Sequence, residues 1–501
     1  MEAGLGPRFR MHGRIAGKRR GASGRRHPQR MRKTKGTAVS IRASLAESLG
    51  RSIRWTERTV FHKAAGNLPG AIAMKAAPDI LSHLGERVES AIVISATNGK
   101  TTTVNLTADC LDEAFPDRTV VCNRDGNNLA GGVVTALLAQ PRSMDRALAC
   151  FECDELYTAQ VLPRLKPRYF MLLNLFRDQL DRFGEIDHVQ QVFVDALAKT
   201  PDTTFVYNGD DPFCAAVAAK VENPTLAFGI VEDLGLEQDS IADSRFCWQC
   251  GAPLDYDYVH YGQLGAWHCT ACDAARPQLA FAARNVVRLD RGFAFDVDFS
   301  LDGAPSTVHI RIPYTGIYMV YNVLAAFAAS VLMGCDRASF KAALAAFSPD
   351  NGRLQRYALP ACEGAAPLSA VSNLAKNPVG FNQNIQMVLT DDARAVAFFV
   401  NDQEGDGLDV SWLWDVDFER LADKPGLRVY AGGSRADDLV VRLKYAGFDA
   451  ECVEGAEDAA AKMAAAFAAD EADSRPVYFV ANYTALPGVR AGLLRLEGGR
   501  A

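Results

Sequence analysis

A lysine and three threonines follow a tight turn near residue 100, and their spacing suits phosphate binding. The segment reads IVISATNGKTTT at 92–103. Gly99 permits a tight backbone turn, Lys100 can reach the β- and γ-phosphates of a nucleotide, and Thr101 offers a hydroxyl to Mg²⁺. The backbone amides that open the following helix add further donors. The general phosphate-loop pattern has glycine where this chain has Ile94, so the pattern alone leaves an ordinary strand–helix turn as an alternative.

A second group of chemically capable residues follows the apolar run in ALACFECDELY, 147–157. Glu152, Asp154 and Glu155 come directly after this expected strand. A carboxylate in this position suits Mg²⁺, which prefers oxygen ligands and takes only one or two carboxylates from protein. We expect Glu152 to bind Mg²⁺ together with Thr101, with Glu155 as the second choice. Without the loop at 99–101, an acidic strand end facing solvent would be the better interpretation.

Four of the 12 cysteines form two CxxC pairs separated by 18 residues. They are Cys247, Cys250, Cys269 and Cys272. This spacing predicts a tetrahedral zinc site in a small hairpin module, with every position filled by protein and hence a structural role. The segment 243–273 carries one arginine and no lysine, which argues against binding to a nucleic acid backbone. The remaining cysteines are expected to be reduced thiols.

The elements that must position these residues alternate between short apolar strands and helices. This alternation predicts a doubly wound α/β domain with the loop at the carboxyl end of its first strand. The run 169–176 is expected to be another buried parallel strand. From about residue 357 a second α/β unit is expected, with strands at Ala395–Val400, Leu427–Ala431 and Val477–Ala481 and a helix at 456–469.

Composition and charge indicate a globular protein with a strongly basic N-terminal segment. The chain has 501 residues, of which 49% are hydrophobic and 23% charged, as in soluble globular proteins. No apolar run reaches the ~18 residues of a membrane span, and Val323–Met333 is expected to be a buried helix. Residues 1–36 hold 12 Lys/Arg and one acid, a net +11, which leaves −17 for 37–501 because the whole chain is −6. We expect a disordered tail or an over-extended gene start there, in preference to a segment that binds lipid or nucleic acid.

Several of these segments together resemble the Mur ligase family, whose members join an ATP-activated carboxylate to an amine. TNGKTT matches the ATP loop of that family, with Ala96 in place of its usual glycine. Asn174, Asp178, Leu180 and Asp181 match its N-x-x-x-D-H-L-D motif, with Gln179 in place of histidine. Gly316 and Asn322 match a G-x-x-x-x-x-N-x-x-A-A segment, while NGR at 351–353 and Asn377-Pro378 occupy the places of two further motifs. The resemblance implies a set of ATP-binding residues: Thr97, Asn98, Gly99, Lys100, Thr101, Thr102, Asn322 and Arg353.

The segment NDQEGDGLDVSWLWDVDFE, 401–419, is similar to the MurT family, the ligase subunits of MurT–GatD lipid II isoglutaminyl synthases. From chemistry alone, its seven acids and two tryptophans are more typical of an acidic surface loop. The resemblance covers about 55–495 and implies the amidation of the D-glutamate α-carboxylate of lipid II through an acyl phosphate. Ammonia would come from a GatD-like glutaminase partner, whose Cys–His pair is completed by Asp409, with Asp415 and Asp406 as alternatives. It further implies ATP, Mg²⁺ and structural Zn²⁺, and work in the cytoplasm at the inner face of the cell membrane.

The predicted organisation is a basic tail at 1–36, a Mur-ligase-type central P-loop domain at 37–350 and a C-terminal Rossmann-like α/β domain of MurT type at 351–501. The four-cysteine zinc ribbon is expected as an insertion at about 243–275. We expect the N-terminal domain that binds the UDP-sugar in standard Mur ligases to be missing, because the residues before the loop are too few for it. Two alternatives remain: a Mur or folylpolyglutamate-type ligase that adds an amino acid, and a non-catalytic ATP-binding zinc-ribbon adaptor. Gln179 and 401–419 count against the first, and the acidic strand end against the second.

Overall fold

The computed structural model describes most of the chain after residue 40. The described residues are 41–61, 66–124, 126–177, 186–237, 239, 243–301, 303–349, 352–360, 367–403, 405–468 and 473–498. The basic tail at 1–36 and Asp178, Gln179, Leu180 and Asp181 lie outside them, so the predictions made for those residues stay predictions. Across the part that is described, no helix is both long enough and apolar enough to cross a membrane.

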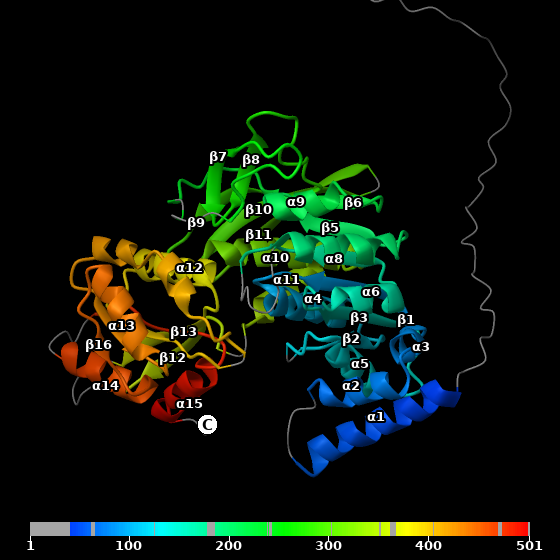
Figure 1. The fold of residues 1–501 in the computed structure, drawn as a ribbon, viewed down its shortest axis with the longest axis horizontal. Coiled ribbons are helices and arrows are strands. Elements are labelled where there is room, and N and C mark those ends of the chain that lie inside the picture. Colours follow the sequence, from blue (N-terminus) through cyan, green and yellow to red (C-terminus); the bar gives the residue numbers. More distant parts are fainter. Residues whose placement is uncertain are drawn as a thin grey trace, which may run out of the picture. The chain divides into compact units, whose positions relative to one another are not determined.

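A nine-stranded sheet forms the framework of the first α/β unit (Figure 1). In spatial order its strands are β11 (Ala304–Ile312), β10 (Phe293–Leu301), β9 (Phe281–Arg288), β6 (Thr225–Ile230), β5 (Thr204–Asn208), β4 (Tyr169–Leu172), β1 (Val88–Ser95), β3 (Ala147–Glu152) and β2 (Val120–Cys122). From β9 through β6, β5, β4, β1 and β3 to β2 the neighbouring strands pair in parallel, whereas the β9–β10 and β10–β11 pairs are antiparallel. Because β1 lies between β3 and β4, the strand order reverses beside it, and such reversals mark the ligand crevice of open α/β sheets.

Helices cover both faces of this sheet because successive side chains of a strand point to opposite faces. Ile92 and Ile94 of β1 join one hydrophobic cluster, and Ala91 and Val93 join the other. The first cluster includes residues of α4 (Lys100–Ala114), α10 (Ile317–Leu332) and α11 (Arg337–Ala346). The second includes residues of α1 (Ile41–Thr59), α2 (Leu68–Ala76), α3 (Ile80–Gly85), α5 (Ala130–Ala139), α6 (Thr158–Leu165), α8 (Ile186–Ala198) and α9 (Pro212–Ala218). The predicted doubly wound arrangement is confirmed.

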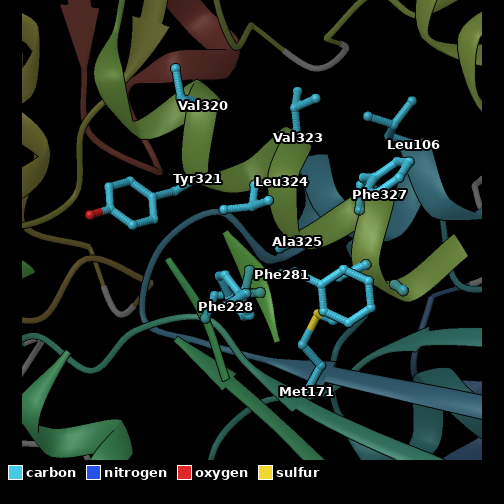
Figure 2. Packing of buried hydrophobic residues seen from close by; sticks show 14 of the residues in the cluster. Leu106, Met171, Phe228, Phe281, Val320, Tyr321, Val323, Leu324, Ala325 and Phe327 are labelled. Carbon is cyan, nitrogen blue, oxygen red and sulfur yellow. The ribbon is translucent and has the colours of Figure 1, made fainter. Parts of the chain in front are cut away.

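Helix α10 is the most deeply buried helix on the first face. Figure 2 shows its Leu324 and Phe327 near Met171, Phe228 and Phe281, which come from the sheet. The run expected to be a buried helix, 323–333, is its second half. By contrast, the expected strand at 169–176 ends at Leu172, since only four of its residues pair with β1 and β5.

A two-stranded antiparallel hairpin, β7 (Leu254–Tyr261) and β8 (Leu264–Cys269), is joined to the sheet by buried polar contacts. The carboxylate of Asp210 accepts hydrogen bonds from Arg276 Nε and from the Tyr321 hydroxyl, both at 2.7 Å. Trp267 Nε1 of β8 donates to the Gly209 carbonyl at 3.0 Å. The hairpin is therefore fixed both to the sheet and to α10.

The second α/β unit is built on a six-stranded sheet. Its strands in spatial order are β12 (Gln355–Leu359), β13 (Leu368–Leu374), β17 (Val477–Ala481), β14 (Ala395–Phe399), β15 (Arg428–Gly432) and β16 (Glu451–Cys452). One face packs against α12 (Pro378–Thr390), η1 (Ser411–Asp415), η2 (Phe418–Asp423) and α13 (Ala436–Tyr445), and the other against α14 (Ala456–Ala466) and α15 (Leu486–Leu496). All pairs except β12–β13 are parallel, so the expected second α/β unit is confirmed.

A buried glutamate attaches α1 to the rest of the first unit. Glu47 is 3% exposed and accepts two hydrogen bonds from Arg87, at 3.0 and 2.8 Å, and one from Arg51 at 3.0 Å. Burial alone would raise the pKa of Glu47, but the hydrogen bonds from Arg87 and Arg51 outweigh it and lower the pKa to about 2. The charged carboxylate therefore stabilises the fold.

We predict that Glu47→Gln lowers the free energy of unfolding by about 2 to 3 kcal/mol at neutral pH, because two arginines lose their buried counter-ion. A carboxylate whose pKa is depressed on folding stabilises above its unfolded value, and this stabilisation is lost as the pH falls through the folded value. The difference between wild type and variant should hence shrink between pH 4.5 and about 2. Urea unfolding at several pH values measures it.

Glu89→Gln is the matched control, because Glu89 pairs with Arg118 and Arg146 at the surface. Its cost should stay below about 1 kcal/mol. Equal losses for the two variants would contradict the anchoring role of Glu47.

Candidate active site

The turn between β1 and α4 adopts the geometry expected of a phosphate-binding loop. Gly99 caps α4 with a φ of +89°, in the left-handed region that favours glycine. A Cβ at Gly99 would come within 2.2 Å of Asn322 Oδ1, so the side chain of Asn322 lies directly against the loop. Asn322 is the sixth residue of α10 rather than its cap, which is Gly316. A residue larger than glycine at 99 would displace both the turn and this amide.

Lys100 is buried in the loop beside an acidic partner. Its ammonium donates to the Ala96 carbonyl and lies 3.2 Å from Glu155 Oε2. Burial alone would lower the pKa of Lys100, but the carboxylates of Glu155, Glu152 and Asp154 outweigh it and raise the pKa. Lys100 is therefore a fixed positive charge at the start of α4.

Among the described residues, a buried carboxylate oxygen near the hydroxyl of Thr101 has no partner. Glu152 is the last residue of β3 and is 3% exposed, and its Oε2 has no hydrogen-bond partner within the described residues. Both side chains lie near Gly126, since a Cβ there would be 3.7 Å from Thr101 Oγ1 and 3.9 Å from Glu152 Oε2. An unpaired buried carboxylate oxygen is costly, and a cation is the natural group to compensate it.

Arg353 adds a second positive charge to the same place. Its Nη2 lies 3.4 Å from Thr101 Oγ1. Burial lowers the pKa of Arg353, and the charge of Glu152 opposes that effect. Lys100, Thr101, Glu152 and Arg353 thus converge at the carboxyl edge of the sheet.

The other loop residues are held by hydrogen bonds of both their side chains and their backbone. The Thr97 hydroxyl accepts from the Phe176 amide at 3.0 Å, and the Asn98 amide donates to Asn174 Oδ1 at 2.9 Å. The Asn98 side chain is 3.3 Å from Asn377 Oδ1, and Asn377 caps α12 by accepting from the Gly380 amide. Thr102 is buried in the first turn of α4. The structure brings every predicted ATP-binding residue together around one loop.

Sequence reasoning missed Asn123, which fixes the position of Glu152. Its Oδ1 accepts from the Glu152 amide at 2.9 Å, and its Nδ2 donates to the Glu152 carbonyl at 2.8 Å. The available signal was its place directly after β2, whose carboxyl end lies at the same edge as that of β3.

The four predicted metal-binding cysteines meet beside the β7–β8 hairpin. All four sulfur atoms lie within 4.8 Å of one another, with 3.6 Å between Cys247 and Cys272 and 3.4 Å between Cys250 and Cys269. Trp248 packs edge-on against Trp267 at 5.3 Å, next to the cluster. This group could hold a metal ion, and thiolates with this CxxC spacing are typical zinc ligands.

The three candidate aspartates of 401–419 have different environments. Asp406 is buried and accepts from the Thr484 amide at 3.1 Å and from its hydroxyl, so its carboxylate is used within the fold. Asp409 is exposed, and Oδ1 accepts from the Ser411 amide at 2.8 Å, which lowers its pKa. Asp415 is half-buried at the end of η1. Asp409 is the most accessible of the three.

Apolar side chains surround Asp409 in the sequence and remain exposed. Leu408 is 72% exposed and Trp414 53% exposed. The Trp414 ring packs edge-on against Tyr445 of α13 at 5.4 Å, and Tyr445 is itself exposed. Exposed aromatic residues beside an accessible charge are typical of protein interfaces.

Two family models match the chain. The model described as Mur ligase middle domain matches residues 94–249, which include the phosphate-binding loop and Glu152. The model described as MurT ligase C-terminal matches residues 374–486, which include Asp409.

Solved structures with a similar fold are Mur-type ligases. A MurF structure from Acinetobacter baumannii has a TM-score of 0.60 at 16% identity, covering 86% of this chain and 80% of that one. A pseudomurein peptide ligase type C from Methanothermus fervidus has a TM-score of 0.58 at 18% identity, covering 81% and 79%. These similarities show the Mur ligase fold.

Relatives in sequence show to which group of Mur-type ligases the chain belongs. The lipid II isoglutaminyl synthase (glutamine-hydrolyzing) subunit MurT of Staphylococcus aureus (strain COL) is 32% identical over 416 residues, which are 82% of this chain and 87% of the relative. The protein of the same name from Streptococcus pneumoniae (strain ATCC BAA-255 / R6) is 31% identical, over 84% and 90%. On this extent of similarity, and with the matching C-terminal model, the chain belongs to the MurT family.

Proposed function

We propose that this chain is the ligase subunit of a two-protein enzyme that amidates the D-glutamate α-carboxylate of lipid II to D-isoglutamine. The observation that carries the proposal is the 32% identity over 416 residues with the S. aureus subunit, whose name states the lipid II isoglutaminyl synthase activity. In this proposal residues 37–350 bind ATP, and residues 351–501 form the C-terminal domain that works with the partner.

The phosphate-binding loop supports ATP as the source of energy. Lys100 and the amides at the start of α4 would bind the phosphates, and Asn322 would bind the nucleotide beside Gly99. Arg353 would compensate the charge that develops during phosphoryl transfer. The carboxylate oxygen of the substrate would attack the γ-phosphorus of ATP, whose bond to the bridging oxygen would break, to form an acyl phosphate and release ADP. Ammonia would then attack the carbonyl carbon and release phosphate, leaving the amide.

The unpartnered oxygen of Glu152 and the nearby hydroxyl of Thr101 fit a hard divalent cation. Mg²⁺ at these two residues would neutralise phosphate oxygens. Asn123 would position Glu152 for this task, because it binds both the amide and the carbonyl of that residue. Glu155 would orient Lys100 instead of binding the cation, since it already pairs with the ammonium.

The exposed Asp409 supports a role toward a GatD-like glutaminase. A carboxylate that orients a histidine of the partner must reach outside its own fold, as the third member of a triad does. Asp409 meets this condition, while Asp406 is occupied by Thr484. Leu408 and Trp414 would provide apolar contact area around it.

The four-cysteine cluster supports structural zinc. Four protein sulfurs complete a tetrahedral site and leave no position for water or substrate. The ion would hold 247–272 against the hairpin, at a distance in sequence from the phosphate-binding loop.

We predict that Asp409→Asn abolishes amidation driven by glutamine, with a loss of about 100-fold or more, because the partner's histidine loses its orienting charge. Activity with supplied ammonium chloride should stay within about twofold of wild type, since ATP chemistry does not involve Asp409. Both rates are measured on lipid II with the purified partner complex.

Lys100→Ala is the comparison variant for Asp409→Asn, because it should impair the ATP-dependent step and not the supply of ammonia. It should reduce amidation about 100-fold or more with either nitrogen source, because phosphate binding is lost. If Asp409→Asn lost both activities alike, or neither, the triad role would be wrong.

We predict that Glu152→Gln raises the Mg²⁺ concentration needed for half-maximal activity by about tenfold or more, since a cation ligand loses its charge. Titration of ammonia-dependent amidation with MgCl₂ at fixed ATP measures this. Glu113→Gln, at an exposed acid near the other end of α4, is the control and should leave the titration unchanged. An unaltered Mg²⁺ requirement in Glu152→Gln would rule out its role as ligand.

We predict about one zinc ion per chain, measured by atomic absorption, and loss of most of this zinc in Cys269→Ser. The fluorescence of Trp248 and Trp267 should change on zinc removal, because both rings pack beside the cluster. Cys452→Ser, at an exposed cysteine outside the cluster, should retain the metal. Full zinc content in Cys269→Ser would show that the cluster is not the site.

A further inference from the structure

The first described helix exposes apolar side chains along one side. Ile41 is 79% exposed, Leu45 66%, Leu49 44% and Trp55 62%. At 3.6 residues per turn these residues share one side of α1 with Ser52. We call these five residues the α1 outer face. Exposed apolar side chains gathered on one side of a helix mark an interaction site.

The opposite side of α1 explains why the outer face is left exposed. Ala43, Ala46 and Gly50 are buried there. A Cβ at Gly50 would come within 3.1 Å of Ala73 in α2 and 2.6 Å of Leu138 in α5, so the first half of the helix packs closely. Together with the ion pairs of Glu47, this packing fixes that half of α1 on the second face of the unit. The part of the outer face that holds Ile41, Leu45 and Leu49 is therefore fixed in place.

Charge around the outer face is positive. Arg42 and Arg58 are exposed and lie on its two flanks, whereas the acid Glu47 is turned inward to Arg87. No acidic residue belongs to the outer face. Apolar residues with tryptophan, bordered by arginine, are the pattern of a helix that lies in the interface of an anionic membrane.

The apolar surface continues toward the active site. Val60 and Phe61 follow α1 and Leu68 opens α2, and all three side chains are exposed. Next to Leu68, the Asn67 side chain lies against Gly132, where a Cβ would be 2.7 Å from Asn67 Oδ1 and 1.9 Å from the Asn127 carbonyl.

From Asn127 the contacts lead to the cation site. The Asn127 carbonyl accepts from Asn123 Nδ2 at 2.9 Å, and the same nitrogen donates to the Glu152 carbonyl. The end of the apolar surface at Leu68 is thus linked to Glu152 through Asn67, Gly132, Asn127 and Asn123.

We propose that the α1 outer face, with Val60, Phe61 and Leu68, is a peripheral docking surface for a bilayer that contains anionic phospholipid. The apolar side chains would enter the boundary between headgroups and acyl chains, and Arg42 and Arg58 would bind headgroup phosphates. This inference rests on the proposed function, because a lipid-linked substrate must be reached at a membrane. Docking would bring the edge that carries Glu152 close to the lipid surface.

The test is co-sedimentation of the full chain, in its partner complex, with two kinds of vesicle. One contains phosphatidylcholine and phosphatidylglycerol in equal amounts, and the other phosphatidylcholine alone. Wild type should bind the anionic vesicles more tightly, and higher salt should weaken this binding. The double variant Leu45→Gln/Trp55→Gln should bind them about tenfold more weakly.

The co-sedimentation experiment has two controls. Val287→Gln removes an apolar side chain that is 55% exposed on β9 and should bind vesicles like wild type. Ammonia-dependent amidation of lipid II dissolved in detergent should be equal in the double variant and wild type, because this assay needs no bilayer. Loss of that activity in every protein, wild type included, would refute the proposed function instead of the docking surface.

Three results would overturn the docking proposal. The first is equal vesicle binding by wild type and the double variant. The second is equal binding by wild type to neutral and anionic vesicles. The third is a change of oligomeric state in the double variant, seen by light scattering, which would make the face a protein interface.

Discussion

The active site depends on one electrostatic constraint: a lysine, an arginine and three carboxylates are buried together at the carboxyl edge of a parallel sheet. Lys100 is paired with Glu155, while Glu152 keeps an oxygen without a partner beside Thr101. Buried charges are tolerated only when they are paired or bind ions. The described residues supply partners for Lys100 and Glu155, and the unpartnered Glu152 oxygen is where we propose that a cation binds.

The topology of the sheet brings these residues together. Strand β1 leads into the phosphate-binding loop, and β3 ends at Glu152. Asn123, which directly follows β2, accepts a hydrogen bond from the backbone amide of Glu152. Arg353 reaches Thr101 from the segment just before β12, so the second sheet contributes to the same site. The hairpin beside the four cysteines is fixed by Asp210 and Trp267 to the sheet and to α10, the helix that also carries Asn322.

Much of this could be predicted from sequence where residue type and spacing decide the structure. The turn at Gly99, the strand that ends at Glu152 and the cysteine cluster follow from local patterns, and the structure has each of them. Asn123 could not be found in this way, because its role depends on β2 lying next to β3. The choice between Asp406 and Asp409 likewise needed the contact with Thr484, which is 78 residues away. The α1 outer face could not be predicted, because apolar residues occur on both sides of this helix. Their pattern in the sequence does not show which side packs against the protein.

The most direct test of the account follows the oxygen atoms of the carboxylate that is amidated. Lipid II labelled with ¹⁸O in its D-glutamate α-carboxylate would be incubated with the complex, ATP, Mg²⁺ and glutamine, and the released phosphate analysed by mass spectrometry. Transfer through an acyl phosphate predicts one ¹⁸O atom in each phosphate formed per amide. Unlabelled phosphate, with the amide still produced, would contradict the central claim that this chain activates the carboxylate by phosphorylation.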